Sequence, residues 1–113
     1  MSLPKYNEFY HDILNALQDG NIHAHTEIRA FIARLRDFSE NDLSELLPSG
    51  KQTVFANRVG WACTYLKKAG LIESPARAKF VITDEGRSVF ASAENVNNEF
   101  LAKYPSSYNK SQR

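Results

Sequence analysis

The spacing of the apolar residues changes at Gly70, and this change restricts the fold more than any other feature of the sequence. Upstream, apolar residues recur at three- and four-residue steps, which predicts a helix from Lys51 or Gln52 to Ala69. Its core stripe consists of Phe55, Val59, Ala62, Leu66 and Ala69. Downstream, residues 71–74 and 79–82 are short β-type runs around the turn 75–78, which predicts a hairpin. A helix that leads directly into a hairpin is typical of a winged helix-turn-helix.

The upstream half of the chain supplies the other helices of that plan. Helical periodicity predicts a first helix over residues 6–17, which Gly20 ends, and a second helix from about Thr26. Residues 21–25 between them are too few for a helix and predict a small strand or an extended link. Ser39 and Asp42 have the spacing of a capping pair and predict a short third helix. The apolar sides of these three helices are predicted to carry Tyr6, Phe9, Tyr10, Ile13, Leu14, Leu17, Ile28, Phe31, Ile32, Leu35, Leu43, Leu46 and Leu47.

A chain of 113 residues fits one domain. Thr83 is expected to cap a further helix, and residues 92–104 are also expected to be helical. We therefore predict a mainly α fold with a small β-hairpin, a winged-helix domain over residues 1–105. The polar residues 106–113 are predicted to be a disordered tail or the start of a linker.

The charge of the chain is distributed unevenly. Residues 51–82 contain six basic residues and one acidic residue, a net charge of +5. The remaining residues contain eight basic and twelve acidic side chains, a net charge of −4. A basic centre between acidic flanks is the pattern expected if one face meets phosphates. The alternative is an ordinary solvated charged surface.

The predicted third main helix carries the residues expected to contact bases. At about 100° per residue, Thr53, Asn57 and Thr64 lie opposite the core stripe, as does Gly60, with Lys68 beside them. Asparagine can bond adenine through two hydrogen bonds, and threonine can contact the methyl group of thymine or methylcytosine. The alternative is that these are exposed polar residues of a helix surface.

Trp61 lies beside the same surface, well away from the core stripe. Such a tryptophan either packs on a neighbour, for example the wing, or offers a stacking surface to a flipped or modified base. Arg58 is expected at the edge of the core, where it can bridge to an acidic neighbour instead of DNA.

Two flanking segments are expected to hold phosphates. Residues 49–52 precede the helix, whose first N–H groups favour an anion, and Arg77 and Lys79 lie in the predicted wing. The residues of the first segment are Ser49, Gly50, Lys51 and Gln52. The alternative for this segment is a plain connecting loop.

No pattern for catalysis or a cofactor is present in the sequence. His23 and His25 alternate as strand residues do, so both can face one way, but no further ligand is evident for a metal. Cys63, the only cysteine, is expected to be a small buried apolar residue. The first ten residues lack a signal-peptide pattern, and no apolar run reaches the roughly 18 residues of a membrane span. We therefore expect a cytoplasmic protein without metal or cofactor.

Several short runs of the sequence form a set that can be compared with known families. The more specific ones are Asn57–Ala62 (Asn-Arg-Val-Gly-Trp-Ala) and the downstream Ala69-Gly70-Leu71. The others are Pro4-Lys5-Tyr6, Leu47-Pro48-Ser49-Gly50, Leu66-Lys67-Lys68 and Thr83-Asp84-Glu85-Gly86. Together these runs resemble the N-terminal domain of Mrr-type restriction endonucleases, and the resemblance covers roughly residues 4–104.

This resemblance implies a domain that reads foreign, often methylated, double-stranded DNA for a restriction system. In that family a nuclease domain normally follows the reader. Such a nuclease uses a Glu- or Gln-x-Lys pair, which occurs nowhere in this sequence. We therefore expect a non-enzymatic reader whose nuclease domain belongs to a parent protein. The alternatives are a stand-alone winged-helix transcriptional regulator and a winged helix that contacts only proteins.

Overall fold

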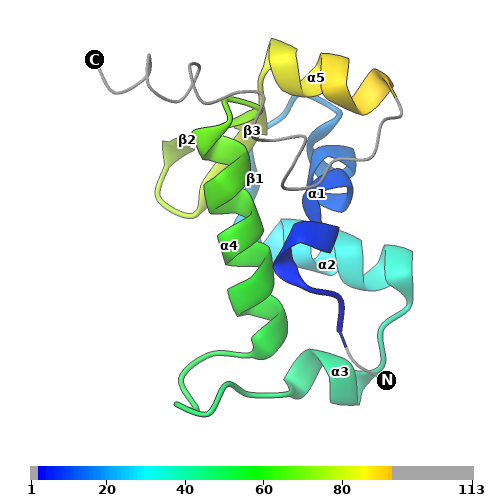
Figure 1. The fold of residues 1–113 in the computed structure, drawn as a ribbon, viewed down its shortest axis with the longest axis vertical. Helices are drawn as coiled ribbons and strands as arrows, with labels where there is room; N and C mark the ends of the chain where they lie inside the picture. Colours follow the sequence, from blue (N-terminus) through cyan, green and yellow to red (C-terminus); the bar gives the residue numbers. More distant parts are fainter. Residues whose placement is uncertain (1–2, 93–113) are drawn as a thin grey trace.

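The first apolar stripe forms two helical segments in the structure, a computed structural model that describes residues 3–92 (Figure 1). A 3₁₀ turn, η1 (Tyr6–Glu8), leads into α1 (Tyr10–Leu17), with Phe9 at the junction between them. The predicted apolar side is correct, since Phe9, Tyr10, Ile13, Leu14 and Leu17 are all fully buried. Helix α1 contacts α2, α4, α5 and β3, which makes it the centre of the core.

Helix α2 (His25–Arg36) packs on α1 through Ile28 and Ile32, as predicted. Leu35 was expected in the same stripe but is 52% exposed. The reason is that the chain turns one residue after the helix, where Asp37 adopts a left-handed conformation (φ 54°). Phe38 folds back instead, and its ring packs edge-on against Phe9 and Phe55 at 6.3 and 5.6 Å.

The short helix α3 (Glu40–Ser44) has the predicted cap. The Ser39 side chain accepts a hydrogen bond from the Asp42 N–H, and the Asp42 carboxylate accepts one from the Ser39 N–H. Leu43 and Leu47 pack against the core, but Leu46, expected with them, is 56% exposed. Leu46 has left the helix and pairs as an isolated β-bridge with Thr53, so helical spacing no longer applies to it.

Helix α4 (Val54–Lys68) starts later than predicted, because Thr53 is its N-cap and accepts a hydrogen bond from the Ala56 N–H at 3.0 Å. Its predicted core stripe is buried throughout. The helix ends as expected at Gly70 (φ 81°), after which the Leu71 N–H donates to the Leu66 carbonyl at 3.0 Å.

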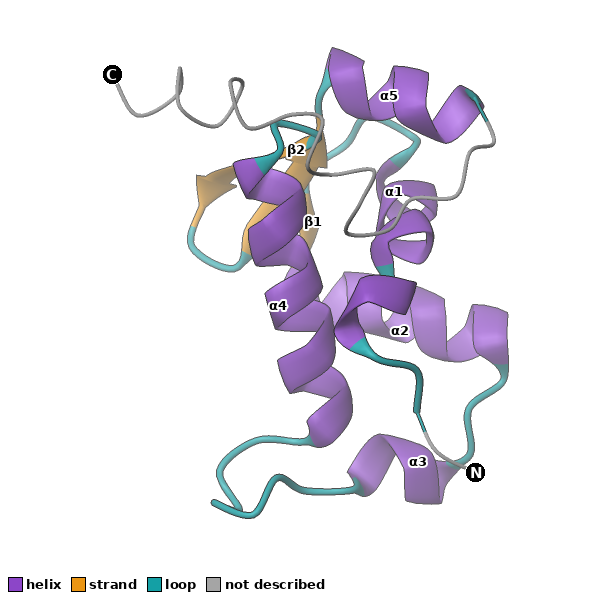
Figure 2. Ribbon diagram, in the orientation of Figure 1, coloured by secondary structure: helices purple, strands orange, loops and turns teal. Residues whose placement is uncertain are grey.

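The wing is part of a three-stranded antiparallel sheet in the order β1-β3-β2 (Figure 2). Strand β1 (His23–Ala24) pairs with β3 (Lys79–Ile82), which pairs with β2 (Ile72–Ala76) in the register Ile72 opposite Ile82. The turn is shorter than the four residues predicted, since only Arg77 and Ala78 separate the strands. A register shift between Glu73 and Ala76 accommodates Pro75 on the edge strand, where proline costs no ladder hydrogen bond.

The predicted cap at Thr83 opens the last described helix, α5 (Asp84–Ala91). Gly86 packs so closely that a side-chain Cβ there would overlap the Leu71 carbonyl oxygen, which fixes α5 against the base of the wing. The mainly helical fold with a small hairpin is therefore confirmed as a winged helix. The helix expected over most of 92–104 and the tail expected at 106–113 lie outside the described residues. Within residues 3–92, every helix is too short or too polar to cross a membrane.

Candidate nucleic-acid interface

The exposed face of α4 presents the residues predicted to contact bases, with one exception. Asn57 and Thr64 lie opposite the buried stripe, and Thr64 is exposed, with its hydroxyl donating to the Gly60 carbonyl at 3.1 Å. The Asn57 side-chain amide donates to the Gln52 side chain at 3.4 Å, a long bond that leaves its oxygen available. Thr53 is the exception, because its hydroxyl caps α4 instead of projecting from the helix surface.

Trp61 is 51% exposed on the same helix. Its ring stacks on Tyr65, one turn further along α4, at a centroid distance of 6.1 Å, so the indole packs on its own helix. Tyr65 in turn contacts the Tyr6 ring at 5.4 Å, and the Lys68 ammonium lies 5.5 Å from the Tyr65 centroid. Tyr6 and Lys68 therefore support the Tyr65 ring on which Trp61 stacks, while about half of the Trp61 side chain remains exposed to solvent.

A small hairpin-like loop precedes α4 and projects beyond its N-terminus (Figure 1). The Leu47 N–H donates to the Gln52 carbonyl at 2.9 Å and the Gly50 N–H to the Leu47 carbonyl at 2.8 Å. Ser49 accepts a longer bond from the Lys51 N–H at 3.4 Å. These bonds close the loop and leave the side chains of Ser49, Lys51 and Gln52 exposed.

The wing turn exposes Arg77 and Lys79. Ala78, the second residue of the turn, has a positive φ of 58° and Arg77 before it does not, which is the pattern of a type II turn. Its carbonyl accepts a hydrogen bond from the His25 N–H at 2.8 Å, which ties the turn to the start of α2. The wing is thus fixed relative to the helices on one side.

Arg58 is held by the protein itself. Its guanidinium donates to the carbonyls of Leu3 and Pro4 at 2.8 and 3.0 Å, so it fixes the N-terminal segment against α4. The expected acidic neighbour is therefore not its partner in the described part of the chain.

The exposed cations differ from the paired ones. The ion pairs of residues 3–92 join His23 to Asp19 and Glu27, and Arg36 to the buried Asp12. Lys51, Lys67, Arg77 and Lys79 have no carboxylate partner among these residues and are exposed. Their charge is therefore available to an external anion.

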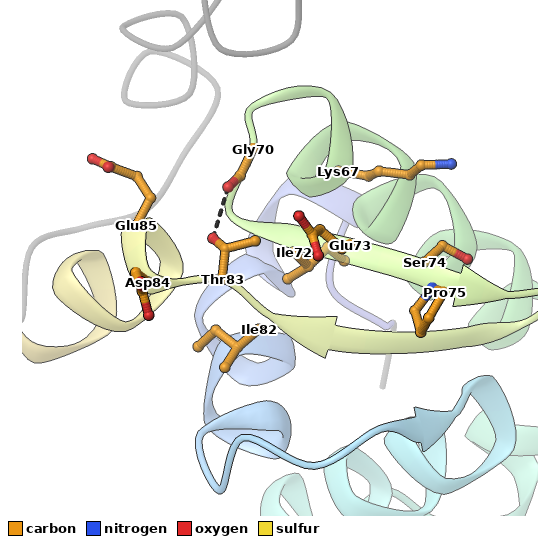
Figure 3. A pocket seen from close by; sticks show the side chains of 10 residues that line it. All are labelled: Lys67, Gly70, Ile72, Glu73, Ser74, Pro75, Ile82, Thr83, Asp84 and Glu85. Carbon is orange, nitrogen blue, oxygen red and sulfur yellow. Dashed lines mark hydrogen bonds between the residues drawn. The ribbon is translucent and has the colours of Figure 1, made fainter. Parts of the chain in front are cut away.

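A cleft at the other end of the wing has the opposite character (Figure 3). It lies between the end of α4, the start of β2 and the start of α5, and its carboxylates are Glu73, Asp84 and Glu85. The Thr83 hydroxyl at its centre donates to the Gly70 carbonyl at 2.7 Å and accepts from the Gly86 N–H at 3.0 Å. This pair of bonds joins the ends of α4, β3 and α5, while the acidic rim disfavours phosphate there.

The two histidines do not act as a strand pair, because His25 is the first residue of α2. His23 bonds to the Asp19 carboxylate at 2.9 Å, whereas Arg29 donates to His25 at 3.0 Å. Among the described residues, no group of three His, Cys, Asp or Glu side chains has the arrangement of a metal site. Cys63 is buried as predicted, and this burial raises the pKa of its thiol to about 12.

Comparison with known proteins places this geometry in a family. The family model described as the Mrr N-terminal domain matches residues 6–92, from η1 to the end of α5. The chain belongs to this family. It is also 32% identical over 89 residues to "Type IV methyl-directed restriction enzyme EcoKMrr" of Escherichia coli (strain K12). The aligned region is 76% of this chain but only 28% of that enzyme, and no solved structure matches the chain.

Within this Mrr N-terminal domain, the most specific of the resembling runs falls on α4. Asn57 and Trp61 of the Asn57–Ala62 run are on the open side of the helix, while Val59 and Ala62 face the core. The second run, Ala69-Gly70-Leu71, forms the helix C-cap and enters the wing. Both runs are therefore placed where they shape or support one surface made of α4 and the hairpin.

Proposed function

We propose that this Mrr N-terminal domain binds double-stranded DNA, with α4 in the major groove and the wing on the backbone, as the reader of a restriction system. The observation that carries the proposal is the separation of charge. Among the described residues, Lys51, Arg77 and Lys79 are exposed without carboxylate partners on the loop before α4 and on the wing. The carboxylates Glu73, Asp84 and Glu85, in contrast, line the cleft at the other end of the wing, together with Lys67. Helix insertion with flanking backbone contacts is how winged helices engage a duplex.

Different residues are assigned different roles in this proposal. In the loop before α4, four residues position the duplex through phosphates: Ser49, Gly50, Lys51 and Gln52. Arg77 and Lys79 do the same in the wing. Lys68 contributes charge at the end of α4. Asn57, Thr64 and Trp61 face the base edges. Arg58 supports the surface from behind, and Thr53 fixes where α4 begins.

Asn57 offers the sharpest test of sequence reading. Asn57→Ala is expected to weaken binding to a preferred site by about 1–3 kcal/mol and to change binding to random duplex little, because a lost base contact affects only the matching sequence. Selection from a random duplex library supplies the preferred site, and fluorescence anisotropy gives the dissociation constants. A uniform loss on all duplexes would assign Asn57 to the backbone instead.

The basic test of the proposal is duplex binding itself. Affinity measured between 50 and 300 mM salt is expected to fall steeply, because phosphate contacts displace counterions. Equal affinity for modified and unmodified duplexes would fit the alternative of a transcriptional regulator. A domain that binds no duplex at low salt would contradict the proposal and favour a protein-contacting winged helix.

We further propose that cleavage belongs to a nuclease domain of the parent protein. The Escherichia coli relative is a restriction enzyme, and this chain aligns with 28% of it. The sequence lacks the Glu-x-Lys and Gln-x-Lys pairs of such nucleases. Purified chain with magnesium and either methylated or unmethylated plasmid is expected to leave the supercoiled form intact. Nicking activity that co-purifies with the protein over successive chromatography columns would contradict the proposal that cleavage belongs to another domain.

A further inference from the structure

His25 lies where three elements of the proposed DNA surface meet. It begins α2, its N–H donates to the Ala78 carbonyl of the wing turn, and its ring lies 6.2 Å from the Phe80 ring on β3. Its Nε2 atom lies 3.6 Å from the point that a side-chain Cβ would occupy at Gly60, on α4. The imidazole therefore occupies the angle between the wing and the proposed groove-facing side of α4.

Arg29 determines which nitrogen of this imidazole carries the proton. The Arg29 Nε–H donates to Nδ1 of His25 at 3.0 Å, and a nitrogen that accepts a hydrogen bond carries no proton. The proton of the neutral ring is therefore on Nε2. Burial and the nearby Arg29 charge lower the pKa of His25, which favours the neutral ring.

The Nε2–H group has no acceptor among residues 3–92. Gly60 lies next to this group on α4, and glycine places no side chain over it. Arg77 belongs to the wing turn whose Ala78 carbonyl accepts the His25 N–H, whereas Lys79 pairs with Ala24 and lies on the opposite face of the strand, beside Thr26 and Glu27. An oriented donor near the cation of the wing turn has surroundings in which a phosphate oxygen is the expected acceptor.

We propose that His25 donates its Nε2–H to a DNA phosphate in the angle between α4 and the wing, and that Arg29 is the positioning residue that fixes this tautomer. This inference rests on the proposed function and adds to it a contact that carries no charge. A neutral donor strengthens binding through a hydrogen bond but displaces no counterion. It therefore acts on affinity without acting on the salt dependence, which separates it from the wing cations.

The test compares two substitutions that differ in one donor. His25→Leu keeps the bulk and removes the donor, and it is expected to weaken binding to every duplex roughly tenfold, with the salt slope unchanged. His25→Gln places an amide N–H near the position of Nε2 and is expected to stay within about threefold of wild type. Fluorescence anisotropy at several salt concentrations gives both quantities, and thermal unfolding followed by circular dichroism shows that each variant is folded.

His11→Gln is the matched control, because His11 stacks on Phe90 of α5 at 5.0 Å, away from the wing, and it is expected to bind as wild type. Nitrogen-15 NMR of the imidazole supplies a second readout on the unaltered domain. The His25 signals are expected to show the Nε2–H form and to shift when duplex is added. In Arg29→Met the Nδ1–H form is expected to appear.

The outcomes separate this inference from the proposed function. A wild-type domain that binds no duplex overturns both. A wild-type domain that binds, with a folded His25→Leu variant of equal affinity, overturns only the inference. The inference is also overturned if folded His25→Leu and His25→Gln lose duplex affinity equally. A reduced salt slope in His25→Leu, or an Nδ1–H signal in the wild type, has the same consequence.

Discussion

Gly60 occupies the middle of α4, where glycine is less favourable than alanine by about 0.5–1 kcal/mol because it loses more backbone freedom on folding. Packing does not require it, since a Cβ at this position would be in ordinary van der Waals contact, 3.6 Å from His25 Nε2. The glycine therefore costs stability without a steric reason inside the domain. A close approach of DNA to this point of the helix would supply the reason.

A substitution at Gly60 is therefore expected to change stability and DNA affinity in opposite directions. Gly60→Ala is expected to raise the free energy of unfolding by about 0.5–1 kcal/mol and at the same time to weaken duplex binding, because the added methyl group covers the groove-facing side and His25 Nε2. Urea unfolding and fluorescence anisotropy measure the two effects. Ser88→Ala, at an exposed position of α5, is the control that improves helix propensity without changing affinity. Unchanged binding by a stabilised Gly60→Ala variant would place DNA elsewhere.

The loop before α4 and the wing are expected to strengthen DNA binding through their positive charges. Lys51→Ala, Arg77→Ala and Lys79→Ala are each expected to weaken binding to all duplexes about equally and to lower the salt slope by about one unit, because each releases one counterion fewer. Affinity measured as a function of salt concentration checks this. Arg34→Ala, which removes an exposed charge near the far end of α2, is the control with an unchanged slope. A variant that loses affinity for one sequence only would be reading bases.

Most of the elements could be predicted from the sequence because their signals are local. Ser39 and Thr83 cap the helices that follow them, and Gly70 ends α4 as expected. The spacing of apolar residues also gave the buried stripe of α4 correctly. Caps and periodicity depend on residues within one or two turns, so a single sequence is sufficient to find them.

The errors occur where a distant contact decides the outcome. Thr53 has a side chain suited to either a helix surface or a cap, and the Leu46–Thr53 bridge fixes it as the cap. Arg58 binds two carbonyls more than fifty residues away along the chain, a pairing without any local pattern. His25 was considered only as a metal ligand, although its four-residue spacing from Arg29 was a usable signal once a helix was assigned there.

At the scale of the whole molecule, the proposed function raises the question of which part of the parent protein would distinguish modified from unmodified DNA. The Escherichia coli relative is named a methyl-directed restriction enzyme, and this chain aligns with 28% of its length. If the reader domain makes the distinction, modification must be sensed on the surface of α4. If the remainder of the protein makes it, this domain contributes only general affinity and delivers the rest to DNA.

Trp61 separates these possibilities, since it is half-exposed, supported by Tyr65 and the only tryptophan in the chain. We expect the isolated domain to prefer duplexes with a modified base over matched unmodified ones, and binding to quench or shift the indole fluorescence because a base stacks on it. Trp61→Ala is expected to abolish the preference while the fold and the salt-dependent background binding persist, since little of the indole contributes to the core. Thr64→Ser removes the methyl group and keeps the hydroxyl, and it is expected to retain the preference if stacking carries it. If modified and unmodified duplexes bind wild type equally across many sequences, discrimination belongs to the rest of the protein; if Trp61→Ala unfolds the domain, the indole is a packing residue.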